Sequence, residues 1–353
     1  MEKLGDLIGP HGHMNRRSFL KLSGWLGLSA TAVGIIPGKA EAVRFDKNMT
    51  KVTKTTLAMG TFVSMTLIHP SKDEAEEAMG RAFNEIDRLS GLLSRFDTAT
   101  AVAVLNKEGQ VKDLPEEVIQ VVSRSLYYHK ISGGSFDITV KPVVDLFRDR
   151  FDGESKRLPT EKEIEGLLKL VGSDKIELRD RSIHLMRPGM GITLDGIAKG
   201  FIVDKASQIL DGHKIENHLI NAGGDIRTKG SNGTSRGWTV AIQDPLKKNH
   251  YPDIIHMKDG AIATSGNYEV YYDREKMFHH IVDPRTGLSP RLTTSVSVAA
   301  KTTMEADALS TSVFVMNPSK GARFVDALSN CECLIIARDG ILTRSKGWKS
   351  QAI

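Results

Sequence analysis

The sequence predicts an α+β fold, as one large domain or two tightly joined ones. Stretches with helical and with strand periodicity are mixed along the chain, without the strict alternation that a doubly wound parallel sheet requires. No segment repeats at a fixed period. About 310 of the 353 residues remain after a predicted leader, which is enough to bury a substantial hydrophobic core.

The N-terminal segment is predicted to be an export signal. Residues 15–21 read Asn-Arg-Arg-Ser-Phe-Leu-Lys, a twin-arginine pattern, and a weakly apolar run follows over 22–36. Residues 40–42, Ala-Glu-Ala, supply a cleavage site, and the apolar run is too short to remain as a membrane span. An ordinary amphipathic helix is the alternative. We predict a cleaved signal peptide over 1–42, a linker over 43–54, a folded domain over 55–353 and a periplasmic location.

Charge and cysteine content narrow the class of protein. The whole chain has a net charge of +5; residues 1–42 hold five Lys/Arg and three Asp/Glu, so the rest carries +3. This balance, with no basic block interleaved with aromatics, gives no support for nucleic acid binding. The two cysteines, Cys331 and Cys333, are predicted to be core thiols on one strand, with a disulfide or metal site as the alternative.

The first half of the domain is predicted to contain one strand and three helices. Residues 55–68 alternate and are rich in β-branched residues, which indicates a strand. Apolar residues at helical spacing predict helices over 71–90 and 115–132, the second closed by two glycines. A capping-box pattern opens a third helix over 160–170, and the polar residues 149–160 before it indicate an exposed loop.

The second half is predicted to be mostly strand. Residues 182–186 and 190–194 resemble paired strands around an Arg-Pro-Gly-Met turn, and 200–211 is predicted to be helical. Further helices are expected over 304–316 and 320–329. Strands are expected over 218–222, 238–243, 254–257, 261–264, 294–299, 333–337 and 341–343.

Two segments near the C-terminus carry the strongest chemical signal. His279 and His280 precede Asp283, which stands in an Asp-Pro-Arg-Thr-Gly turn; adjacent histidines in a strand face opposite ways, so at most one is expected in a site. Asp307 and Thr311 are four residues apart and share one helix face. A carboxylate and a hydroxyl suit Mg²⁺ better than zinc, and a base beside such a site indicates phosphoryl or nucleotidyl transfer. A plain helix with a buried threonine is the alternative.

Four glycine-containing turns are candidates for ligand contact, each with an ordinary structural turn as the alternative. The glycines in residues 196–200 would let the backbone approach an anion at the start of a helix, and Lys199 adds a positive charge for a phosphate. The glycine spacing fits neither the dinucleotide fingerprint nor the P-loop. Residues 133–137 place an aromatic ring and a carboxylate at a turn, suited to a flat ring and a ribose. The other two turns cover residues 221–225 and 264–269.

The order of these motifs resembles the ApbE family, the FAD:protein FMN transferases. The resemblance runs from about residue 55 to the C-terminus. It rests on Met-Gly-Thr at 59–61, Gly-Ser-Phe-Asp at 134–137, Leu-Asp-Gly-Ile-Ala-Lys-Gly at 194–200, Asn-Ala-Gly-Gly-Asp-Ile at 221–226, Thr-Ser-Gly-Asn-Tyr-Glu at 264–269, His-Ile-Val-Asp-Pro-Arg-Thr-Gly at 280–287 and Glu-Ala-Asp-Ala-Leu-Ser-Thr at 305–311.

The resemblance implies an α+β fold related to the T-fold, with FAD in a cleft between two lobes. It also implies a reaction that depends on Mg²⁺, with Mn²⁺ as the alternative ion. FAD is split, FMN is attached through a phosphoester to a Ser or Thr hydroxyl of an acceptor protein, and AMP is released. The expected acceptors are exported or membrane-anchored electron-transfer proteins. A dry cleft would keep water from competing with the acceptor hydroxyl.

The resemblance also assigns roles to individual residues. His280 is implied to take the proton of the acceptor hydroxyl, with Asp283 supporting it. The metal ligands implied are the backbone carbonyl near Gly196 and the side chains of Asp307 and Thr311, with Ser310 beside them. The positions implied to contact FAD are Met59, Phe96, Ser135, Phe136, Asp137, Thr193, Lys199 and Val282.

The chain departs from the family pattern at two places. Many members read Asp-Leu-Gly-Gly where residues 193–196 read Thr-Leu-Asp-Gly, so the carboxylate is displaced by two positions. Many also have Ser-Glu where residues 98–102 read Thr-Ala-Thr-Ala-Val. Neither change affects His280 or the pair of Asp307 and Thr311. The alternatives to a transferase are an FAD-binding carrier without activity and a Mg²⁺-dependent FAD pyrophosphatase.

Overall fold

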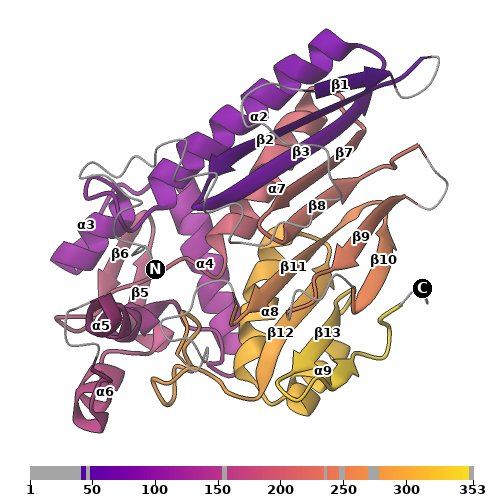
Figure 1. The fold of residues 1–353 in the computed structure, drawn as a ribbon. Coiled ribbons are helices and arrows are strands. Elements are labelled where there is room, and N and C mark those ends of the chain that lie inside the picture. Colours follow the sequence, from indigo (N-terminus) through magenta and orange to yellow (C-terminus); the bar gives the residue numbers. More distant parts are fainter. Residues whose placement is uncertain are drawn as a thin grey trace, which may run out of the picture.

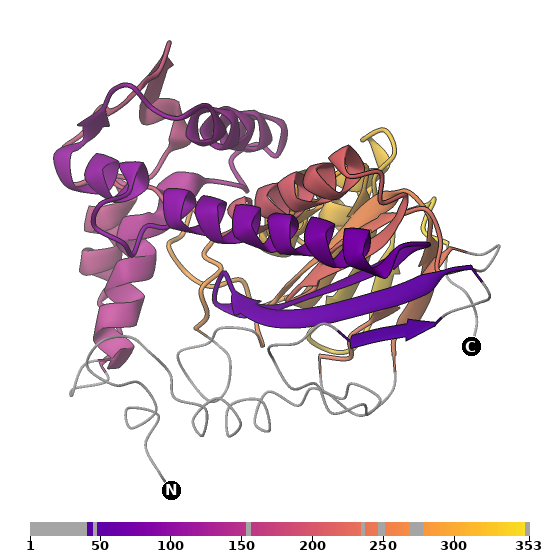
Figure 2. The same ribbon diagram turned by 90° about the horizontal axis from the view of Figure 1, so that it is seen from above.

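The computed structural model describes residues 41–44, 48–152, 157–233, 237–245, 251–268 and 278–349. The predicted α+β class is confirmed: one large sheet carries a layer of helices on one face, and a smaller, mainly helical lobe lies at one end (Figures 1 and 2). Most of the predicted signal peptide lies outside the described residues. Among the helices described, none is long and apolar enough to cross a membrane.

Within the described part of the chain the large sheet has nine strands, and neighbouring strands pair antiparallel throughout. Strands from distant parts of the sequence meet at its centre, where β3 pairs with β7 and β8 pairs with β11. In spatial order the strands are β1 (Glu41–Arg44), β2 (Thr50–Ala58), β3 (Thr61–His69), β7 (Asn217–Ala222), β8 (Asp225–Lys229), β11 (Gly260–Gly266), β12 (Thr293–Ala300), β13 (Glu332–Ala337) and β14 (Leu342–Arg344).

The N-terminal edge of this sheet corrects two predictions. Residues 50–54, expected in a linker, begin β2, which pairs with β1 on one side and β3 on the other; a strand of an antiparallel sheet with one polar face does not need a continuous apolar pattern. The single strand expected over 55–68 is a hairpin of β2 and β3. Met59 and Gly60 form its turn with φ of 53° and 71°, the left-handed values that two-residue hairpin turns favour.

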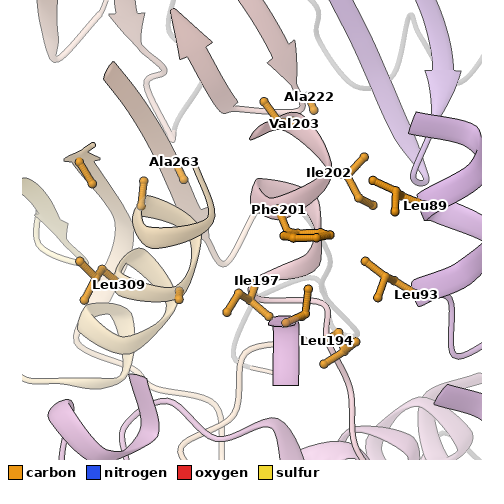
Figure 3. Packing of buried hydrophobic residues seen from close by; sticks show 14 of the residues in the cluster. Leu89, Leu93, Leu194, Ile197, Phe201, Ile202, Val203, Ala222, Ala263 and Leu309 are labelled. Carbon is orange, nitrogen blue, oxygen red and sulfur yellow. The ribbon is translucent and has the colours of Figure 1, made fainter. Parts of the chain in front are cut away.

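Four helices cover one face of the sheet: α2 (Lys72–Leu93), α7 (Ala198–Gly212), α8 (Thr303–Val315) and α9 (Pro318–Asp326) (Figure 2). All four match helices predicted from periodicity. Figure 3 shows α7 at the centre, with Phe201 and Ile202 between Leu89 of α2 and Leu309 of α8. A helix surrounded in this way is fixed by burial of apolar side chains, which is the main stabilising term in folding.

Gly200 brings the first turns of α7 and α8 into contact. A Cβ atom at this position would lie 2.4 Å from the carbonyl oxygen of Thr303, so only glycine allows this approach. The two helix N-termini therefore meet, and the backbone of α7 comes within reach of side chains on α8.

The second face of the sheet is partly covered by a hairpin of β9 (Trp238–Ile242) and β10 (Asp253–Met257). Its apolar residues pack against Ile262, Leu334 and Trp348. The indole nitrogen of Trp348 donates to the carboxylate of Asp253 at 2.9 Å, which attaches the C-terminal segment to this hairpin.

The smaller lobe contains most of the differences from the prediction. Helices α3 and α5 were not predicted, nor was β8 in the large sheet. The strand expected at 182–186 is present as β6 but pairs with β5 and β4, while 190–194 forms no strand. Residues 149–152, expected in a loop, end α5. The lobe consists of α3 (Ala101–Glu108), β4 (Gln110–Val111), α4 (Glu116–Ile131), η2 (Ile138–Val140), α5 (Lys141–Asp152), α6 (Glu161–Leu168), η3 (Ser173–Lys175), β5 (Ile176–Arg179) and β6 (Ser182–Leu185).

Both cysteines are free and buried, which confirms the prediction of core thiols. Burial raises the pKa of Cys331 and of Cys333 to about 12, so both are uncharged thiols at neutral pH.

His218 gives the folded state a defined response to acid. Its Nδ1 lies 3.0 Å from the carbonyl oxygen of Ile215 and its Nε2 lies 2.8 Å from the hydroxyl of Ser207. Since the carbonyl only accepts, Nδ1 carries the proton of the neutral ring and Nε2 accepts from Ser207. Burial lowers the pKa of His218 to about 4.

We expect this histidine to destabilise the protein on acidification. Because the folded pKa lies below the unfolded value of about 6.5, stability is complete above that value and falls as the pH decreases towards 4, by up to roughly 3 kcal/mol. Urea unfolding of the wild type and of His218→Gln at pH 7.5 and 4.5 measures the effect. The variant should lose correspondingly less stability between the two pH values; equal losses would contradict the assignment.

Candidate active site

The site forms where the N-termini of α7 and α8 meet the end of β11. Asp307, in the second turn of α8, is only 4 % exposed, and the backbone N–H of Gly200 donates to its Oδ2 at 3.0 Å. Burial first, and then the neighbouring carboxylate of Asp225, raises the pKa of Asp307 well above its usual range. Two buried carboxylates so close together require a positive charge nearby.

Lys199 and Asp225 form an ion pair beside Asp307. The Lys199 Nζ lies 2.7 Å from Asp225 Oδ2, and Asp225 is 1 % exposed. Burial raises the pKa of Asp225, while Lys199 acts in the opposite direction. Lys199 therefore supplies the positive charge that this pair of acids requires, and it stands in the first turn of α7, where backbone N–H groups also favour an anion.

A cluster of hydroxyl groups lies one turn further along α8. Ser265 Oγ, on β11, is 2.8 Å from Ser310 Oγ and 3.3 Å from Thr311 Oγ1. Gly196 lies directly opposite: a Cβ there would be 3.0 Å from Thr311 Oγ1 and 3.4 Å from the ring of Phe136. The structure thus brings together the backbone near Gly196, Asp307, Ser310 and Thr311, which the sequence placed in one metal site.

The donor atoms of this cluster fit a hard cation. They are a buried carboxylate, hydroxyl oxygens and a closely approaching glycine backbone, all oxygen ligands of the kind that Mg²⁺ prefers. Within the described residues no three His, Cys, Asp or Glu side chains group as metal ligands. A cation at Asp307 would therefore depend on hydroxyl and carbonyl oxygens, and on oxygens of its substrate.

The two adjacent histidines have different environments. His279 is 1 % exposed; its backbone N–H donates to Ser289 Oγ at 3.0 Å, and its ring packs edge-on against Phe314 at 5.5 Å. His280 is partly exposed, with its ring centroid 6.5 Å from that of His279. The expectation that at most one of the pair serves a site agrees with this arrangement, and His280 is the accessible member.

The loop that follows His280 is held by Asp283. Its backbone carbonyl accepts from Thr286 and Gly287, which closes the predicted turn. Both oxygens of its carboxylate accept from Arg285, at 2.9 Å each. This pairing gives Asp283 a structural role in the turn, whereas its predicted support of His280 stays a prediction.

Comparison with known proteins identifies the family. A family model described as the ApbE family matches residues 59–335, well over half of the chain. The chain belongs to the ApbE family. It is 29 % identical over 265 residues to the FAD:protein FMN transferase of Haemophilus influenzae, covering 72 % of this chain and 77 % of that protein.

Solved structures agree with this ApbE-family membership. The crystal structure of the ApbE protein of Thermotoga maritima superimposes with a TM-score of 0.76 at 30 % identity, covering 84 % of this chain and 97 % of that one. A histidine-to-glycine variant of the flavin transferase ApbE of Vibrio cholerae gives a TM-score of 0.74 at 26 % identity, with the same coverage of 84 % and 97 %.

The residues expected to contact FAD divide into exposed and buried groups. Phe96 is 68 % exposed, and Met59 is partly exposed in the β2–β3 turn. Val282 is buried against a cluster on α5 and α6, so its side chain supports the loop of His280. Ser135, Phe136, Asp137 and Thr193 are each less than a tenth exposed.

Asp137 illustrates why a motif residue need not meet a ligand. Its carboxylate accepts from the backbone and hydroxyl of Thr139 at 2.8 and 2.5 Å, from the backbone and hydroxyl of Ser173 at 3.0 and 2.8 Å, and pairs with His129 at 3.2 Å. Burial alone would raise the pKa of Asp137, but His129 and these donors hold it below its usual value. Its oxygens thus fasten η2 to η3.

Sequence reasoning missed four residues of this region. Ser265 and Asp225 stand in motifs that were recognised as turns, but nothing in the sequence places them beside Thr311 and Lys199. Arg95 carried no motif signal, and Asp195 was noted only as a departure from the family pattern. The contacts of these four residues join positions at least 26 apart in sequence, so they depend on tertiary structure.

Gly196→Ala tests the close approach to Thr311. The added methyl group must displace the Thr311 hydroxyl or the loop, and such overpacking costs about 1–3 kcal/mol. We expect transfer activity to fall at least about tenfold, because sub-ångström shifts at a reacting centre are costly. Gly91→Ala is the matched control, since nothing lies within 4 Å of a Cβ at that helical position. Wild-type activity in Gly196→Ala would show that the approach is not needed.

Proposed function

We propose that this protein is an FAD:protein FMN transferase that uses Mg²⁺. The observation that supports this most is the convergence of Asp307, Thr311 and the Gly196 backbone beside Lys199 at the start of α7. This arrangement offers oxygen ligands for a cation and a positive site for phosphate where α7 and α8 meet. Named relatives of the ApbE family, such as the Haemophilus influenzae protein, are flavin transferases.

In the proposed reaction, the hydroxyl oxygen of a Ser or Thr on the acceptor protein attacks the FMN phosphorus of FAD. The bond from that phosphorus to the oxygen that bridges to AMP breaks, and AMP leaves with the bond electrons. His280 takes the proton of the acceptor hydroxyl, a task suited to an imidazole near neutral pH. The products are an FMN phosphoester on the acceptor and free AMP.

The residues around the phosphates bind and orient them. Lys199 and the first N–H groups of α7 would face the pyrophosphate, and the buried ring of Phe136 beside Gly196 would help to keep water away from it. Asp307, Thr311 and the Gly196 carbonyl would hold Mg²⁺, with Ser310 and Ser265 orienting the hydroxyl of Thr311. When bound, Mg²⁺ supplies charge neutralisation for the leaving AMP, and Mn²⁺ is the alternative ion.

The decisive experiment uses purified residues 43–353 with FAD, Mg²⁺ and a candidate flavin-accepting domain. Mass spectrometry should find an FMN adduct on a Ser or Thr of the acceptor, formed together with AMP and abolished by EDTA. Free FMN and AMP in the presence of several acceptors, without an adduct, would instead identify an FAD pyrophosphatase. Intact bound FAD with no AMP would identify a flavin carrier.

We further propose that the protein acts in the periplasm after twin-arginine export, on exported or membrane-anchored electron-transfer proteins. The support is the order of arginine pair, apolar run and A-x-A site in residues 15–42. Replacing Arg16 and Arg17 by lysine should retain the full-length precursor in the cytoplasmic fraction. Unchanged export of this variant would refute the twin-arginine assignment.

A further inference from the structure

Arg95 is a buried arginine that joins three separate segments. It follows the end of α2, and its side chain is only 7 % exposed. Its Nη1 lies 2.9 Å from Asp145 Oδ1 on α5, and its Nε lies 3.3 Å from Asp195 Oδ2 in the loop before α7. One guanidinium thus links the helical layer of the sheet, the smaller lobe and the loop that carries Gly196.

The partner on α5 is a firm anchor. Asp145 also binds Lys141 Nζ at 2.5 Å and Arg148 Nη2 at 3.2 Å. Burial alone would raise the pKa of Asp145, but Lys141 and Arg95 hold it below its usual range, so it remains a carboxylate. If Arg95 moved away, the partly buried carboxylate of Asp145 would lose one of these three cationic partners, which is unfavourable.

The partner in the loop, Asp195, lies next to the candidate site. The backbone N–H of Asp195 donates to Thr193 Oγ1 at 3.3 Å, and Thr193 N–H donates to the carbonyl of Ile138 at 2.8 Å. The next residue is Gly196, which approaches Thr311. The position of the Asp195 carboxylate therefore affects how closely the Gly196 backbone meets the α8 hydroxyls.

Arg95 also supports the exposed ring of Phe96. The guanidinium carbon lies 4.4 Å from the centre of that ring, within the range of a cation–π contact. A large aromatic ring that is 68 % exposed would otherwise sample many rotamers. Held on a buried cation, it is prepared to stack on a flat ligand ring with little loss of side-chain entropy.

We propose that Arg95 is a positioning residue for FAD, which holds the Phe96 ring and the Asp195–Gly196 segment in one arrangement. Asp195 is its partner, and the carboxylate that is displaced by two positions from the family pattern thereby binds an arginine of this chain. This inference rests on the proposed function, because it presumes that FAD is the ligand of the cleft.

The test is FAD binding without turnover, measured by quenching of flavin fluorescence and by the rise in melting temperature with FAD and with Mg²⁺ alone. Arg95→Gln should raise the Kd of FAD at least about tenfold, equivalent to about 1.4 kcal/mol. Arg95→Lys should restore only part of this affinity, since lysine lacks the planar fork that binds two carboxylates and stacks on a ring. Arg88→Gln is the control: Arg88 lies on α2, shortly before Arg95 in the sequence, and binds Glu85 and Glu117.

The double variant tests whether Arg95 affects FAD affinity through Asp195. Asp195→Asn should raise the Kd of FAD by a smaller factor, and Arg95→Gln with Asp195→Asn should bind no more weakly than Arg95→Gln, because both remove one shared contact. Unchanged FAD affinity in Arg95→Gln and Arg95→Lys would overturn the proposal, as would a lowered melting temperature with unchanged affinity. If the two substitutions raised the Kd of FAD by independent factors that multiply in the double variant, Arg95 would not act through Asp195. Failure of the wild type to bind FAD would count against the proposed function itself.

Discussion

Asp307→Asn is expected to lower FMN transfer by about 10²–10³-fold, as removal of a charge-stabilising group at a reaction centre commonly does. The amide oxygen can still accept from Gly200 N–H, so the local backbone is retained. It lacks the negative charge that the cation requires. The Mg²⁺ concentration for half-maximal activity should therefore rise strongly, and FAD cleavage should decline together with transfer.

Stability separates this effect from misfolding. Burial and Asp225 raise the pKa of Asp307, so a neutral amide relieves repulsion between two buried carboxylates. The melting temperature of Asp307→Asn without Mg²⁺ should equal or exceed that of the wild type. Ser312→Ala, which removes a buried hydroxyl that donates along α8 to the carbonyl of Ala308, is the control for a change on the same helix. A Mg²⁺ titration of Asp307→Asn that matched the wild type would disprove the metal assignment.

His280→Ala is expected to keep FAD affinity within about threefold while transfer falls by about 10²–10⁴-fold, the usual contribution of general base catalysis. The reason is that the proposed base acts on the acceptor hydroxyl and not on FAD. Flavin fluorescence gives the affinity, and adduct formation by mass spectrometry gives the transfer rate. His184→Ala provides the comparison, because His184 lies on β6 with its side chain about half exposed and pairs with Glu177. Wild-type transfer rates in His280→Ala would remove it from the mechanism.

The sequence predicted best the long helices that bury many apolar side chains. The helices α2, α7 and α8 have apolar residues at helical spacing over several turns, and their sequence limits agree with the structure within a few residues. The prediction failed for short elements. The two-residue turn at Met59-Gly60 was overlooked inside an alternating stretch, and α5 was missed although Lys141 and Asp145 form an ion pair at the four-residue spacing of a helix.

The residues of the candidate site also fall into two groups, those that the sequence predicted and those that only the structure brings in. Asp307 and Thr311 were predicted together because they stand four residues apart on one helix, where spacing alone determines which side chains are neighbours. Ser310 and Gly196 were added through the family resemblance, and the structure brings Gly196 close to Thr311. The partners across the pocket were not predicted: Ser265 reaches Thr311 from β11, and Asp225 reaches Lys199 from β8.

What the sequence alone determined is the family, the helices of the sheet layer and the residue types that suit phosphate chemistry, since each depends on local order and spacing. Only the tertiary structure decided how charge is balanced. Asp225 and Asp307 are buried near each other, with Lys199 paired to Asp225. Asp137 pairs with His129 inside the smaller lobe, and Asp195 pairs with Arg95. These outcomes depend on which carboxylates lose water and which donors replace it, and that is settled by contacts between segments far apart in the chain.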